Sequence, residues 1–264
     1  MKAGEKMASK ESCIAVFDSG VGGISVLREL VKCMPREKFL YFGDSANAPY
    51  GSRPTEQILE LTLAAVEKIM TRPVKALVIA CNTATAVAVD TLREKYPDLV
   101  IVGTEPAVAV GARMFPGGTV GVMATPATLG SPRILSLIAR KAGDARVELL
   151  PVAELAAIVE QGKENDPQTV ALLKNYLDPV KDSLDALVLG CTHYPFAAPA
   201  IREALGREIP LLDGGKAIAR RTQQLLEEKQ LLSPGNGELV WENTLGTPRI
   251  LALSRRLLDT RIDL

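Results

Sequence analysis

Two cysteines occupy the same point of two closely similar stretches of the sequence. Cys81 lies in ALVIACNTATA (76–86) and Cys191 in ALVLGCTHYPF (186–196), each after an apolar run and before polar residues. A single cysteine at such a place is most often a packing residue. Two thiols facing one cleft could instead remove a proton from one face of a carbon and return a proton to the other, which inverts the centre. The repeat therefore favours racemisation, because hydrolysis by Cys191 with His193 as its base would leave Cys81 unexplained.

The elements that must position these cysteines follow from the alternation of apolar runs and amphipathic segments. Short apolar runs predict buried strands at 13–17, 38–43, 76–80, 99–103, 119–124, 147–152, 186–190 and 209–213. Helical patterns fall between them at 24–33, 55–70, 84–95, 131–141, 167–182, 199–205 and 217–230. Strands separated by helices of this length predict an α/β fold with mostly parallel sheets flanked by helices.

The repeat also predicts how the chain is divided. IAVFDSG and ALVIACNTATA form one ordered pair of strand ends, and VGVMATPATLG and ALVLGCTHYPF form a second pair in the same order. We expect two similar α/β half-domains: 1–104 (with a tail at 1–12) completed by 209–264, and 105–208. Ligands of open α/β sheets bind beyond the carboxyl ends of the strands. The active site is therefore expected in the cleft between the halves, with both thiols facing it.

Each cysteine is followed by a polar pair at the point where a helix should begin. Asn82-Thr83 follow the first cysteine and Thr192-His193 follow the second. Unpaired N–H groups and the positive end of a helix dipole lower the pKa of a nearby thiol and bind carboxylates. A free thiol has a pKa of about 8.5, so two thiols that serve as bases near neutral pH are expected.

Composition and charge exclude several classes of function. Lys plus Arg and Asp plus Glu both number 31, so no basic surplus points to nucleic acid as a partner. No uninterrupted run of about 18 apolar residues predicts a membrane span, and the N-terminal residues do not resemble a secretory signal. A cytoplasmic protein is expected. GVGG (20–23) lacks the third glycine of a dinucleotide-binding turn and no Walker A lysine follows, so no nucleotide cofactor is expected.

The four cysteines have no C-x-x-C spacing, and His193 is the only histidine. A metal site is therefore not expected, and the cysteines should be free thiols. Cys13 and Cys33 fall on a predicted strand and helix and are expected in the core.

Seven stretches closely resemble one known family. In chain order they are FDSGVGGISVLREL, YFGDSANAPYGSRP, LVIACNTATA, GTEPAV, TPATLGS, VEQGK and LVLGCTHYPF. They are similar to the glutamate racemases of the cofactor-independent aspartate/glutamate racemase family. The resemblance runs from residue 14 to about residue 200, and DSGVGG, PYG, CNTA and GCTHYP are its most specific parts.

The resemblance implies a role for each matching residue. Cys81 would deprotonate D-glutamate and Cys191 would deprotonate L-glutamate. Asp18 would receive the α-ammonium or orient the nearby thiol, Ser19 would lie beside it, and His193 would support Cys191. The remaining substrate contacts would be made by the backbone of Tyr50 and Gly51 and by the donors of Asn82, Thr83 and Thr192.

Some positions keep two interpretations. Asp18 could simply cap the helix that follows it. Asp44 and Glu160 match acidic positions of the family, yet either could be a solvated surface residue. Thr125 and Thr128 keep the family's threonine spacing, but Pro132 stands where an aromatic residue is common, so both are weaker substrate-binding candidates. Near the C-terminus, WENTLGTPRILALS matches the family only loosely.

The resemblance implies glutamate as substrate, no cofactor, a homodimer, and a role in supplying D-glutamate for peptidoglycan. Aspartate or another amino acid as substrate is the alternative, followed by a non-catalytic amino-acid-binding protein. Without a cofactor, the carbanion must be stabilised by preorganised donors in a site that excludes water, so the halves are expected to close on the substrate.

Overall fold

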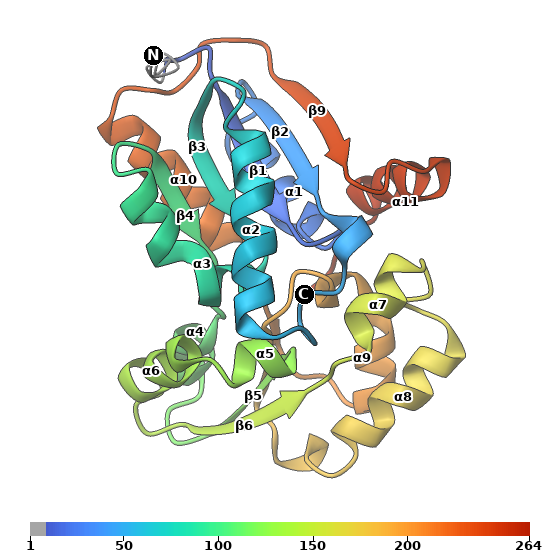
Figure 1. The fold of residues 1–264 in the computed structure, drawn as a ribbon. Coiled ribbons are helices and arrows are strands. Elements are labelled where there is room, and N and C mark those ends of the chain that lie inside the picture. Colours follow the sequence, from blue (N-terminus) through green and yellow to red (C-terminus); the bar gives the residue numbers. More distant parts are fainter. Residues whose placement is uncertain (1–8) are drawn as a thin grey trace.

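The first sheet is built from segments that lie far apart in the chain, as the computed structural model of residues 9–264 shows (Figure 1). The rest of the expected tail, residues 1–8, lies outside the described residues. The strands follow the order β4-β3-β1-β2-β9 and are all parallel. Their bounds are β1 (Cys13–Asp18), β2 (Lys38–Gly43), β3 (Val74–Ile79), β4 (Val100–Gly103) and β9 (Glu238–Asn243).

The second sheet repeats this arrangement. Its parallel strands are β5 (Thr119–Ala124), β6 (Arg146–Pro151), β7 (Ala186–Leu189) and β8 (Leu211–Leu212), in the order β6-β5-β7-β8. The order β8-β7-β5-β6 corresponds to β4-β3-β1-β2 of the first sheet. Cys81 follows β3 and Cys191 follows β7, so the two cysteines hold equivalent positions. The predicted fold of two similar α/β halves is confirmed.

Helices cover both faces of each sheet. Around the first sheet are α1 (Ile24–Cys33), α2 (Thr55–Ile69), α3 (Asn82–Lys95), α10 (Gly215–Glu228) and α11 (Pro248–Asp259). Around the second are α4 (Val108–Met114), α5 (Pro126–Leu129), α6 (Pro132–Lys141), α7 (Leu155–Glu160), α8 (Pro167–Leu177) and α9 (Ala198–Leu205). Short 3-10 turns occupy Ser45–Asn47, Lys181–Ser183 and Tyr194–Ala197.

The core of the first half follows from the two-residue period of its strands. Ile14 and Val16 point to the face covered by α1, α10 and α11, whereas Ala15 and Phe17 point to the face covered by α2 and α3. Parallel strands that are buried on both faces read as continuous apolar runs, which is why these strands were evident in the sequence.

Two predicted elements differ from the structure: a strand of the C-terminal segment, which was expected to pack on the first half, and a helix of the second half. The strand predicted at 209–213 pairs with β7, because a short turn after α9 lays Pro210 beside Leu187. It therefore belongs to the second sheet, whereas α10, β9 and α11 do lie against the first half. The helix predicted at 167–182 ends at Leu177, because Pro179 has no N–H with which to continue the helical hydrogen bonds.

The chain crosses between the halves twice, and the two crossings touch. A side-chain carbon at Gly214 would lie 2.9 Å from the carbonyl oxygen of Glu105, so glycine is needed for this close approach. The crossings hold the carboxyl ends of both sheets toward one another. Within residues 9–264, no helix has the length and apolar character needed to span a membrane.

Candidate active site

Both repeat cysteines border one cavity between the halves. The cavity has a volume of about 10 Å³, which is room for about one water molecule. Cys81 and Cys191 are both buried there. The other residues around the cavity are Ser19, Pro49, Tyr50, Gly51, Asn82, Thr83, Thr125, Ala156, Thr192 and His193.

Cys81 caps the N-terminus of α3. The backbone N–H of Ala84 donates to its Sγ at 3.4 Å, and its thiol donates to Ser19 Oγ at 3.5 Å. The expected helix N-terminus is present here. After Cys191 a helix also begins, with His193 at its N-cap, but its first turn, Tyr194–Ala197, is 3-10 and α9 follows from Ala198.

Asp18 joins the two halves beneath this cavity. One carboxylate oxygen accepts from Gly20 N–H at 2.9 Å, and the other accepts from the Thr192 hydroxyl of the second half at 3.0 Å. The side chain is completely buried and does not cap α1. Burial raises the pKa of Asp18, although His193 and these two hydrogen bonds oppose the shift.

The environment of Cys81 suppresses its ionisation. Burial raises its pKa to about 12, and the negative charge of Asp18 adds to the effect. The hydrogen bonds with Ser19 and with the Ala84 N–H act in the opposite direction, as expected for a helix N-terminus, but they are outweighed. The expectation of a thiol ready to act as a base near neutral pH was therefore wrong for Cys81 in this closed arrangement.

Cys191 has an imidazole beside it. His193 Nδ1 lies 3.6 Å from the Cys191 sulfur, and His193 Nε2 lies 2.8 Å from Glu160 Oε1. Burial lowers the pKa of His193, but its hydrogen bonds to Cys191 and Glu160 outweigh burial and raise the pKa well above its usual value. A protonated imidazole donates from both nitrogens, which suits an anion on each side.

Glu160 reaches this position from the last turn of α7. Its carboxylate also accepts from Val21 N–H at 2.6 Å and from the Ser45 hydroxyl at 3.2 Å, both in the first half. The glycines of DSGVGG explain why this is possible. A side-chain carbon at Gly20 would collide with the Glu160 carboxylate, and one at Gly22 would collide with the His193 ring. The glycine-rich turn therefore seats the imidazole and carboxylate of the opposite half.

The threonines predicted around the site form a buried hydroxyl cluster across the halves. Thr83 Oγ1 lies 3.0 Å from that of Thr125 and 3.1 Å from that of Thr128. Of these three threonines, Thr83 and Thr125 border the cavity with the thiols. Gly51 packs directly on the Thr125 side chain.

The other predicted residues divide into two groups. Ser19, Tyr50, Gly51, Asn82, Thr192 and His193 border the cavity. Four lie behind residues that border it: Asp44 accepts from the Tyr50 hydroxyl at 2.6 Å, Asp18 contacts Thr192, Glu160 contacts His193, and Thr128 contacts Thr83. Asp44 and Glu160 are thus not solvated surface residues in this structure.

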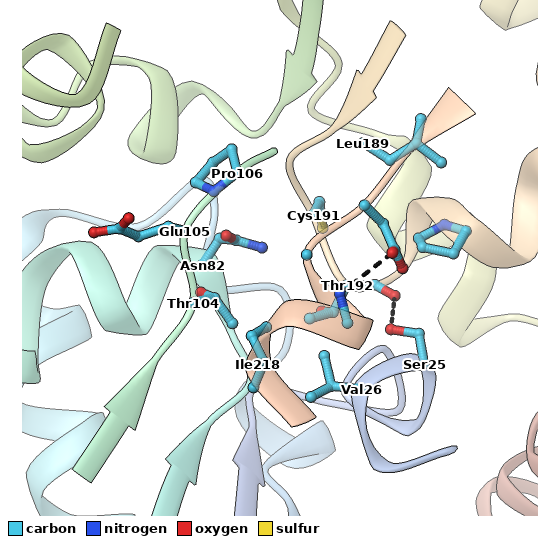
Figure 2. A pocket seen from close by; sticks show the side chains of 14 residues that line it. Ser25, Val26, Asn82, Thr104, Glu105, Pro106, Leu189, Cys191, Thr192 and Ile218 are labelled. Carbon is cyan, nitrogen blue, oxygen red and sulfur yellow. Dashed lines mark hydrogen bonds between the residues drawn. The ribbon is translucent and has the colours of Figure 1, made fainter. Parts of the chain in front are cut away.

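A second small cavity lies behind the cysteine-bearing turns (Figure 2). It has a volume of about 20 Å³ and shares Asn82, Cys191 and Thr192 with the first. Ser25 donates from its hydroxyl to the Thr192 carbonyl at 2.9 Å, drawn as a dashed line in Figure 2. This contact was not predicted, because a serine at the second position of a predicted helix carries no distinguishing signal.

A larger hollow lies elsewhere, and neither thiol borders it. It has a volume of about 550 Å³ and follows the outer edge of β4 between α3 and α10. Its residues include Arg93, Arg133 and Arg221 at the rim. Both thiols and the imidazole of His193 converge on the smaller inter-half cavity, which is therefore the candidate site. Within residues 9–264, no three His, Cys, Asp or Glu side chains are grouped as metal ligands.

Comparison with known proteins places this geometry in context. The family model for Asp/Glu/Hydantoin racemase matches residues 15–222. The chain is 40% identical over 256 residues to the glutamate racemase of Clostridium acetobutylicum, covering 96% of this chain and 100% of that one.

Solved structures agree with this match. The structure of glutamate racemase from Francisella tularensis in complex with D-glutamate aligns with a TM-score of 0.84 and 30% identity, covering 96% of each chain. The Escherichia coli glutamate racemase, solved with L-glutamate and the activator UDP-MurNAc-ala, aligns with a TM-score of 0.82 and 34% identity, covering 93% of this chain and 95% of that one.

Proposed function

The chain belongs to the Asp/Glu/Hydantoin racemase family and is an isomerase, and we propose that it interconverts L- and D-glutamate by proton transfer at Cα between two thiols. The observation that carries the proposal is that Cys81 and Cys191, from equivalent places in the two halves, border one buried cavity. The similar proteins solved with D-glutamate and L-glutamate support glutamate as the substrate.

The reaction balances with two thiols and no redox step. From L-glutamate, the Cys191 thiolate takes the α-proton and becomes a thiol, and the bonding electrons remain on the substrate as a carbanion. The Cys81 thiol then gives its proton to the opposite face and becomes a thiolate. From D-glutamate the roles reverse. Each turnover leaves the two thiols in exchanged protonation states, which solvent restores.

His193 supports the Cys191 side of this cycle. An imidazolium that lies between Cys191 and Glu160 can donate a hydrogen bond to each, and it places a positive charge beside the Cys191 sulfur. The raised pKa of His193 keeps this imidazolium charged near neutral pH. The positive charge beside Cys191 is therefore present before substrate binds.

Beside Cys81, the positive charge would come from the α-ammonium group of the substrate. Burial and the Asp18 charge raise the pKa of Cys81 to about 12. Without substrate the thiol therefore stays protonated near neutral pH and cannot accept a proton. The α-ammonium of glutamate, bound beside Asp18, would neutralise that carboxylate and favour a thiolate at Cys81. Substrate binding thus creates the reactive form of this thiol.

The carbanion is stabilised by donors rather than by a cofactor. Asn82, Thr83 and Thr192 present side-chain and backbone donors where the substrate carboxylates would lie. Fixed donors in a site without bulk water interact more strongly with developing charge than donors in solution do.

Entry of substrate requires the halves to separate. A cavity of about 10 Å³ has no room for glutamate. The contacts that span the halves, such as those from Asp18 to Thr192 and from Glu160 to Val21, would open for entry and re-form around the bound substrate. Closure then excludes water during proton transfer.

The proposed setting is bacterial cytoplasm, where the product would supply D-glutamate for peptidoglycan. The activator named for the E. coli relative contains a peptidoglycan sugar acid, which supports this assignment. Restored growth of a strain that requires D-glutamate would test it. A homodimer is proposed from the family resemblance, with light scattering after gel filtration as its test.

A substrate panel tests the activity. We expect circular dichroism to record the loss of optical activity from either enantiomer of glutamate, without added cofactor. Aspartate should be converted at least about a hundredfold more slowly, because it is one methylene shorter and cannot place both carboxylates on the same donors. Faster conversion of aspartate, or no conversion of glutamate, would overturn the substrate assignment.

A further inference from the structure

The C-terminal helix α11 is fixed to the first half at one end and along one face. It follows β9 of the first sheet, and Ile250 and Leu257 are buried with α1 in one apolar cluster. The Arg28 guanidinium of α1 donates to the carbonyl of Leu257 at 3.0 Å and also to the carbonyl of Thr260. These contacts cap the last turn of α11 and leave the helix little freedom relative to α1.

An adjacent face of α11 contacts the turn at residues 160–164, which belongs to the second half. Arg249 Nη1 donates to the carbonyl oxygen of Glu160 at 2.9 Å. Arg256 Nη1 lies 2.5 Å from Glu164 Oε1. Leu253 shares the buried apolar cluster of the first half with Val159 of α7. In Figure 1, α11 lies above α7.

The buried carboxylate of Glu164 is neutralised by its ion pair with Arg256. The Glu164 side chain is only 3% exposed, whereas the Arg256 side chain is 47% exposed. The second carboxylate oxygen of Glu164 is buried and has no hydrogen-bond partner within the described part of the chain. A buried carboxylate is retained at such a place only when a cation offsets its charge. The ion pair therefore determines where the turn can lie.

The turn in question carries the carboxylate that contacts His193. Glu160 is the last residue of α7, its side chain bonds to His193, and its own carbonyl is held by Arg249. We propose that α11 positions Glu160, and through it His193, against Cys191, with Arg249 and Arg256 as positioning residues. This inference rests on the proposed role of Cys191 and His193 in proton transfer.

The first experiment replaces Arg256. In Arg256→Gln, the turn loses its cation, and a displacement of about 1 Å at His193 is enough to lower kcat by about tenfold or more. KM should change less than kcat, because the arginine touches no residue that borders the substrate cavity. Arg255→Gln makes the same charge change on an exposed residue of the same helix and should retain the rate. Arg256→Lys keeps the cation and should restore most of it.

The second readout follows the imidazole directly. His193 is the only histidine in the chain, so its nitrogen resonances can be assigned without further variants in untagged protein. The groups that face it are Cys191, Glu160 and Asp18. Because the contact with Glu160 raises the pKa of His193, a displaced Glu160 should let the ring lose its proton at lower pH in Arg256→Gln. Arg255→Gln should titrate as the parent protein does.

Several outcomes would overturn the inference. An unchanged kcat and His193 titration in Arg256→Gln would do so, as would equal effects in Arg255→Gln. If Arg256→Gln fails to fold, Arg249→Gln gives the same two readouts, since it removes only an exposed hydrogen bond to the Glu160 carbonyl. If the parent protein does not racemise glutamate, the titration still tests the positioning, so the two proposals fail separately.

Discussion

The surroundings of Cys81 and Cys191 differ although their positions in the two sheets are equivalent. Cys81 has a carboxylate, Asp18, and a serine hydroxyl beside it, with a helix N–H behind its sulfur. Cys191 has an imidazole beside it and a carboxylate behind that ring. Strand β1 ends in Asp18, whereas β5, its counterpart in the second half, ends in Ala124 and so places no carboxylate beside Cys191. The repeated backbone therefore supplies matching places for two thiols, but not matching chemistry.

This difference shows how two thiols can work on one small zwitterion. Near Cys191 the protein supplies the cation, in the form of protonated His193. Near Cys81 the protein supplies an anion, and in the proposed mechanism the α-ammonium of the substrate would become the cation. Asp18 would bind that ammonium, whereas a second imidazole beside Cys81 would repel it. The different charges beside the two thiols therefore suit a substrate that carries its positive charge on one side of Cα.

Removing either thiol should have the largest effect. Cys81→Ala and Cys191→Ala should each lower kcat for racemisation by about 10⁴-fold, because each leaves one face of the carbon without a proton carrier. Cys33→Ser removes a thiol outside the site and should retain the parent rate. Comparable loss in Cys33→Ser, or substantial racemisation by either alanine variant, would contradict the two-thiol account.

Replacing the imidazole should separate the two sides kinetically. We expect His193→Gln to lower kcat by about 10²-fold to 10³-fold. The enantiomers are equal in energy, so kcat/KM must fall equally in both directions. Rates with α-deuterated substrates show which proton transfer has slowed. With L-glutamate the deuterium is removed by Cys191, so the isotope effect should rise in His193→Gln. With D-glutamate the deuterium is removed by Cys81, so the isotope effect should fall. Equal changes with the two enantiomers would show that His193 does not act on one side only.

Removing the carboxylate beside Cys81 should make that thiol more reactive while impairing catalysis. Burial is the main cause of the raised pKa of Cys81, and the Asp18 charge adds to it, so Asp18→Asn should lower that pKa by about one unit. At a fixed pH below the pKa, alkylation of Cys81 should then be about tenfold faster. Peptide mapping by mass spectrometry measures this rate, with Cys33 in the same digest as the reference. Unchanged alkylation of Cys81 relative to Cys33 would refute the electrostatic coupling.

The hydroxyl cluster beside Cys81 should contribute mainly to stability. Thr128 bonds to Thr83 and Thr125 but does not border the thiol cavity. Thr128→Val should lower the free energy of unfolding by about 1 kcal/mol, since one buried hydroxyl network loses a member, and should leave KM nearly unchanged. Ser25→Ala, which removes a hydrogen bond to the Thr192 carbonyl, is the counterpart beside Cys191. Urea unfolding measures both; a large rise in KM for Thr128→Val would instead indicate a substrate contact.

The sequence pattern predicted the strands that are buried on both faces, because their apolar runs are continuous. It did not predict β9, which is a partly exposed edge strand with Glu238 and Glu242 paired to Lys38 and Arg72. Nor did it predict α4, α5, α7 and α11: the first three are too short to show a helical period, and α11 lies in the segment that matches the family only loosely.

The site was predicted unevenly for a similar reason. Residues that follow a strand in a distinctive motif, such as Cys81 and Thr192, were found because their place on the sheet follows from the chain. The contact of Glu160 with His193 joins residues of separate elements, and no local pattern encodes it. The opposite electrostatic surroundings of the two thiols depend on burial and on partners from the other half, so they became evident only in the folded structure.

The most direct test of the two-thiol account is the source of the new hydrogen at Cα. L-glutamate converted in heavy water should give D-glutamate that carries deuterium at Cα from the first turnovers, while the remaining L-glutamate keeps its protium, because the proton removed by Cys191 is not the one delivered from Cys81. Mass spectrometry of the separated enantiomers measures both. D-glutamate that retains the substrate's own hydrogen at early times would mean that a single group carries the proton across, and would contradict the account.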